Sequence, residues 1–81
     1  MLRFQPGRVA TGVDEDGMLV WSEERLVAVL VRLSEIHAGL DLVGHWFLET
    51  GYGRLDVGDK PTFADLDAAR AWIAARLGVE G

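Results

Sequence analysis

The sequence predicts an α+β fold in which an antiparallel sheet of three to five strands packs against one C-terminal helix at about residues 63–77. Three observations support this class: short apolar segments punctuated by Gly and Pro, a clear alternation over residues 45–50, and an alanine-rich segment near the C-terminus with helical spacing. A chain of 81 residues is long enough for one small globular domain, so residues 1–81 are treated as a single unit.

The N-terminal quarter reads as short extended pieces joined by turns. Residues 2–5 are expected to form a strand closed by the turn dipeptide Pro6-Gly7, and residues 8–13 a second extended piece. The run 14–17 has turn composition, with Gly17 available for a positive φ. Residues 18–21 are then predicted to form a short apolar strand.

The next segment, residues 22–39, fits two structures. As a strand, residues 26–33 carry apolar side chains on both faces, which suits a central strand buried on both sides. As a helix at about 23–38, the segment has Ser22 as a possible N-cap and Gly39 as a possible C-cap. The alternating valines favour the strand, and the second helix is kept as the alternative.

A further strand is predicted at residues 45–50, after a loop at 35–44 that contains two glycines. Strict alternation would place Trp46, Leu48 and Thr50 on one face of this strand. The opposite face would carry His45, Phe47 and Glu49. A bend follows at 51–53, and residues 54–60 are expected to form a loop or a short edge strand.

The C-terminal helix has start and stop signals as well as an apolar stripe. Thr62 is the expected N-cap, and Gly78 the expected C-cap. The residues predicted to face the sheet recur at helical spacing: Leu66, Ala69, Ile73 and Leu77.

Charge and composition exclude several classes of function. Thirteen acidic residues against eight basic ones give a net charge of -5, which argues against nucleic-acid binding through a basic field. The absence of cysteine removes disulfides, thiolate metal ligands and cysteine nucleophiles. With no long apolar run and no signal-peptide pattern, we expect a soluble, cytoplasmic protein that does not enter membranes.

No pattern predicts a catalytic, cofactor or metal site, so we expect a protein that is not an enzyme and has no cofactor. Serines lack a nucleophile-elbow context, and the glycines around Tyr52 lack a phosphate-loop pattern. His37, Asp41 and His45 are spaced i, i+4, i+8. They span a predicted loop, however, so this spacing does not gather them as metal ligands.

The apolar fraction of 49% is high for a small domain, which favours self-association or a protein partner. Our leading hypothesis is therefore a non-catalytic protein-interaction module that forms a homodimer. Its candidate interface is a second apolar face of the C-terminal helix, formed by Trp72, Ala68, Ala71 and Ala75.

Two alternative functions use aromatic side chains on the sheet. One is a nucleic-acid-binding domain in which a three-stranded sheet stacks bases and a helix supports it. The other is a small-ligand-binding domain. The candidate exposed aromatic or ligand face consists of Trp46, Phe47, Tyr52 and His45.

Overall fold

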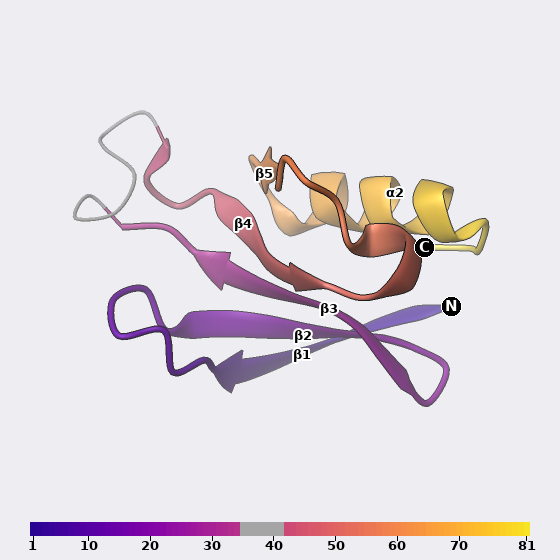
Figure 1. The fold of residues 1–81 in the computed structure, drawn as a ribbon, viewed down its shortest axis with the longest axis horizontal. Coiled ribbons are helices and arrows are strands. Elements are labelled where there is room, and N and C mark those ends of the chain that lie inside the picture. The colour runs from indigo at the N-terminus through magenta and orange to yellow at the C-terminus, as the bar shows by residue number, and fades with distance from the viewer. Residues whose placement is uncertain (35–41) are drawn as a thin grey trace.

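A computed structural model describes residues 1–34 and 42–81. It confirms the predicted class: a five-stranded antiparallel sheet lies under a single α-helix of the described chain (Figure 1). The elements in chain order are β1 (Leu2–Arg8), β2 (Asp16–Ser22), β3 (Arg25–Arg32), β4 (Trp46–Gly51), the short 3-10 helix η2 (Gly53–Leu55), β5 (Thr62–Phe63) and α2 (Leu66–Leu77).

The sheet is a meander in which every strand pairs with the next one along the chain. β3 is therefore central, between β2 and β4, while β1 forms one edge and the two-residue β5 forms part of the other. Antiparallel neighbours need only short connections, which is how a chain of this length builds five strands.

The core lies between the sheet and α2. Val20, Leu30 and Leu48 come from three adjacent strands, and each is 0% exposed. Ile73 and Ala69 project onto them from the helix, and Leu55 closes the layer from η2. This face of the sheet, called the helix side below, is where burial of apolar surface stabilises the fold.

The helical stripe predicted from spacing is confirmed, but the helix begins later than expected. Thr62 and Phe63 pair with β4 and so are extended. Asp65 caps the helix instead of Thr62: its side chain accepts a hydrogen bond from the backbone N–H of Ala68 at 2.8 Å. Gly78 is the C-cap, with a left-handed φ of 70°. No helix within residues 1–34 and 42–81 is long and apolar enough to cross a membrane.

The predicted boundaries in the N-terminal quarter are wrong. β1 runs through Pro6 and Gly7 instead of ending there. Pro6 has no backbone N–H to donate, and a strand tolerates this at the sheet edge because the affected position can face solvent. Gly17 lies inside β2 opposite Gly7, so it is not the turn residue. The chain reverses between β1 and β2, where Gly12 has a φ of 93°.

The ambiguous segment forms a strand: β3 covers residues 25–32, so the helix alternative at 23–38 is wrong there. Residues 35–38 of that alternative, with the proposed C-cap Gly39, lie outside the described residues. The valine spacing was informative because β-branched side chains fit a pleated surface with neighbours on both sides.

The alternation predicted for β4 holds as far as Leu48 and then shifts. Leu30 pairs with Leu48, but the preceding Val29 pairs with Thr50, so Glu49 is an extra residue in a β-bulge. Thr50 therefore takes the face of its partner Val29, opposite to the face of Leu48. Strict alternation had assigned Thr50 to the wrong face.

Candidate functional site

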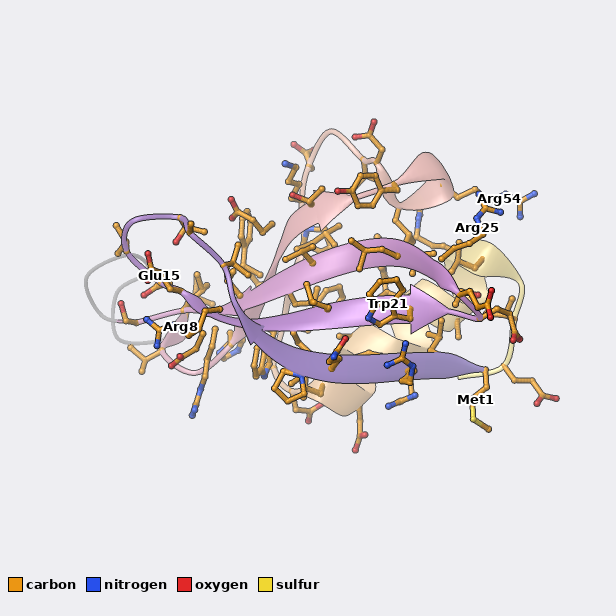
Figure 2. All side chains as sticks on the ribbon, turned by 90° about the horizontal axis from the view of Figure 1, so that it is seen from below. Met1, Arg8, Glu15, Trp21, Arg25 and Arg54 are labelled. Carbon is orange, nitrogen blue, oxygen red and sulfur yellow. The ribbon has the colours of Figure 1, made fainter. Side chains whose placement is uncertain are left out.

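The two faces of the sheet differ in what covers them. α2 lies over one face, whereas no element of the described chain lies over the centre of the other, which we call the open face (Figures 1 and 2). Figure 2 looks onto this open face, with Trp21 near its middle and α2 behind the sheet.

The centre of the open face is apolar across three strands. Leu19 and Trp21 come from β2, Val29 from β3 and Phe47 from β4; all four are partly exposed and none belongs to the buried core cluster. Leu19 is the direct cross-strand partner of Val29. We call these four residues the open patch: Leu19, Trp21, Val29 and Phe47.

The polar atom of the largest side chain in the patch is already satisfied. The Trp21 indole Nε1 donates a hydrogen bond to the Gln5 side-chain Oε1 at 3.1 Å. The Arg3 guanidinium lies 5.4 Å from the centre of the Trp21 ring, a cation–π contact. Both partners come from β1, next to β2. The indole N–H would therefore keep its acceptor if another molecule covered the Trp21 ring.

One end of the open face is closed by the β1–β2 connection. Gly17 stands opposite Val31, and the Val9 side chain occupies the space that a Cβ on Gly17 would need. Val31 is only 2% exposed. At the same end Arg8 forms ion pairs with Glu15 at 3.1 Å and Asp16 at 3.2 Å, so this end is polar and internally paired.

The helix residues predicted as an interface divide into two groups. Trp72 is partly buried, with its ring 5.5 Å from that of Phe63 and the Arg76 guanidinium 4.9 Å from its centre. It packs against the core at the edge of α2. The other three are exposed small residues: Ala68, Ala71 and Ala75. Association through this helix face stays a prediction.

The predicted aromatic face is not gathered in one place. Trp46 packs against the core on the helix side, whereas its neighbour Phe47 lies on the open face, because successive strand residues point to opposite faces. Tyr52 is 50% exposed in the bend after β4, and His45 is partly buried before it. Of these four, only Phe47 belongs to the open patch.

The described residues contain no group of three or more His, Asp or Glu side chains arranged to hold a metal ion. Two of the three residues weighed for such a site, His37 and Asp41, lie outside the described residues. The third, His45, uses its backbone in the connection before β4: its N–H donates to the Leu42 carbonyl at 3.0 Å.

Sequence reasoning missed Trp21 as a surface residue although it placed Trp21 in a strand. The alternation of Leu19 and Trp21 against Met18 and Val20 was present, but all four are apolar, so the pattern did not show which pair is covered. The decisive information is the position of α2, which covers one face only.

The chain matches no protein-family model, and no curated protein or solved structure shows significant similarity to it.

Proposed function

We propose that this chain is a non-catalytic protein-interaction module and that a second copy of the chain binds on the open face. The observation that carries the proposal is the open patch: four apolar side chains from three adjacent strands, with no element of the described chain across them. Contiguous apolar surface of this kind is typical of interaction sites.

The size of the face suits a small two-fold dimer. Four strands about 4.8 Å apart, each contributing about six residues of about 3.3 Å, cover on the order of 400 Å² in plan. The accessible surface of the side chains on such a face exceeds its plan area. A standard interface buries roughly 800 Å² on each partner, so a dimer through this face would be at the small end of the range. Two such faces would pack as a sandwich with the sheets about 10 Å apart.

A flat face can pair with its own copy if it is self-complementary, because a two-fold axis brings the same surface from both chains together. Trp21 would be the anchor, since tryptophan is enriched among the residues that dominate binding energy. Its indole N–H already has an acceptor in Gln5, so burying it in a dimer carries little polar cost.

Charges at the two edges of the face favour one orientation. Arg3 lies on β1 at one edge, and Glu49, which follows Leu48 in β4 and so shares the face of Phe47, lies toward the other. A two-fold axis parallel to the strands would place β1 of each copy across from β4 of the other. Arg3 and the partner's Glu49 would then lie on facing strands, offset by about two residues along the strand direction, and the interface would contain two such pairs of opposite charges.

The test is the dimer dissociation constant, measured by sedimentation equilibrium over a wide concentration range. Trp21→Ala should weaken the dimer by about 30-fold or more, the effect of losing an interface anchor. Ala71→Glu, a change on the exposed surface of α2, is the matched control and should leave the constant unchanged.

Charge reversal tests the orientation. Arg3→Glu and Glu49→Arg should each weaken the dimer by about tenfold, and the double variant should recover most of the affinity. A wild-type chain that stays monomeric at high concentration would contradict the proposal. So would a dimer that Ala71→Glu or Ala68→Glu disrupts while Trp21→Ala does not, because the interface would then lie on the helix.

A further inference from the structure

A cavity of about 360 Å³ lies at the end of the molecule opposite the Arg8–Glu15 pair. Its walls come from three regions that are far apart in the sequence: the end of β2 with the start of β3, the bend and 3-10 helix after β4, and the C-terminal end of α2. Small-molecule sites have volumes from about 300 Å³ upward and combine apolar walls with a few polar groups.

Two arginines line this cavity. Arg25 begins β3 and Arg54 lies in η2, and Figure 2 shows their side chains next to each other. Both are exposed, and within residues 1–34 and 42–81 neither guanidinium has a hydrogen-bond or ion-pair partner. A third cation is near, since the Arg76 Nε donates to the backbone carbonyl of Arg54 at 3.3 Å.

This concentration of positive charge is unusual in a chain whose net charge is -5. None of the described residues that line the cavity is acidic. Glu23 and Glu24 are in the neighbouring β2–β3 turn, where Glu23 pairs with the N-terminal amine at 3.6 Å. Two guanidinium groups in proximity repel each other, so an anion bound between them would relieve that repulsion.

The rest of the cavity offers different chemistry. Leu26, Val27 and Leu77 provide apolar walls, and Tyr52 contributes an aromatic ring with a hydroxyl group. The lining of the cavity thus combines cationic, apolar and aromatic side chains. A guanidinium group binds a carboxylate or phosphate through paired N–H donors, which makes two of them selective for an oxyanion.

We infer that this cavity binds a small organic oxyanion: a carboxylate or phosphate attached to a compact apolar or aromatic group. Arg25 and Arg54 hold the oxyanion, and the apolar group lies against Leu26, Val27 and Leu77. The site uses none of the open patch residues, so it stands or fails independently of the proposed dimer.

The experiment is a titration of the 81-residue chain with phenyl phosphate and, separately, with phenylacetate, followed by amide chemical shifts. At least one anion should produce saturable shifts at Arg25, Tyr52 and Arg54, with a dissociation constant below about 1 mM. Tighter binding of phenyl phosphate would identify a phosphate site, and tighter binding of phenylacetate a carboxylate site.

Three variants and one uncharged ligand make the result specific. Arg25→Gln and Arg54→Gln should each weaken binding by about tenfold, whereas Arg8→Gln, which removes an exposed guanidinium at the opposite end of the molecule, should not. Benzyl alcohol, which has a similar ring and no charge, should bind at least about tenfold more weakly. The inference is overturned if neither anion gives saturable shifts, or if the two glutamine variants at the cavity bind as well as the wild type.

Discussion

The two faces of the sheet have similar side chains but different surroundings. On the helix side, Val20 and Leu30 are 0% exposed under α2. On the open face, the adjacent residues Leu19 and Val29 are equally apolar yet partly exposed. The comparison shows that, within residues 1–34 and 42–81, both faces of the sheet carry apolar residues but a helix covers only one of them. In the proposed dimer, a second copy of the chain covers the other face.

The largest expected difference between the faces comes from the same substitution made on each. Leu30→Ala should lower the free energy of unfolding by about 3 kcal/mol, because it leaves a cavity in a closed core. Leu19→Ala should cost about 1 kcal/mol, because the side chain is partly solvated already. Urea denaturation, at protein concentrations below the dimer dissociation constant, measures the unfolding free energy of both variants. Equal losses would mean that the open face is buried within the monomer.

Substituting threonine for valine compares the two faces of the sheet with an added hydroxyl group and almost no change in side-chain size. Val20→Thr should cost about 2 kcal/mol, since the hydroxyl group enters an apolar layer without a partner. Val29→Thr should change the unfolding free energy of the dilute chain by no more than about 0.5 kcal/mol. Thermal unfolding of both variants tests this; a Val29→Thr loss as large as that of Val20→Thr would contradict it.

A third prediction concerns the helix that distinguishes the two faces. Asp65→Ala should destabilise the fold by about 1 kcal/mol, because the Ala68 N–H loses its capping acceptor. Asp67→Ala is the control: it lies in the same first turn and should cost only a few tenths of a kcal/mol. Chemical denaturation compares the two, and the account of the cap is wrong if Asp67→Ala has the larger effect.

The smallest expected effect lies at the edge of the open face. Gln5→Ala removes the acceptor of the Trp21 indole N–H on an exposed edge strand, so water can replace it. The unfolding free energy should fall by less than about 0.5 kcal/mol. The Trp21 indole proton should nevertheless exchange faster with solvent, which NMR detects. Unchanged exchange would show that the Gln5 contact does not protect it.

Much of the fold was predictable because its signals are local. The spacing of Ala69 and Ile73 predicts which face of α2 packs on the sheet, and alternation predicts that Trp46 and Leu48 share one face of β4. The predictions are wrong at positions where strand pairing decides how far a strand extends or which face a side chain takes. The extension of β1 through Pro6 depends on its edge position, and the reversed face of Thr50 depends on a bulge opposite Val29.

The candidate sites were less predictable because they depend on which elements come together. Trp72 was chosen from its position on the helix, where it packs against Phe63 in the structure. Trp21 was overlooked because a strand with apolar residues on both faces does not reveal which face has a cover. Arg25 and Arg54 are far apart in the sequence, so only the arrangement of β3 and η2 places them at one cavity.

The most direct test of the proposed dimer is an isotope-filtered NOE experiment on a mixture of labelled and unlabelled chains. In a dimer through the open face, the Trp21 ring should give intermolecular contacts to the methyl groups of Leu19 and Val29 on the other copy. Intermolecular contacts confined to the alanine methyl groups of α2 would contradict it. A sample that is monomeric at the concentration of the experiment and gives no intermolecular contacts would contradict it as well.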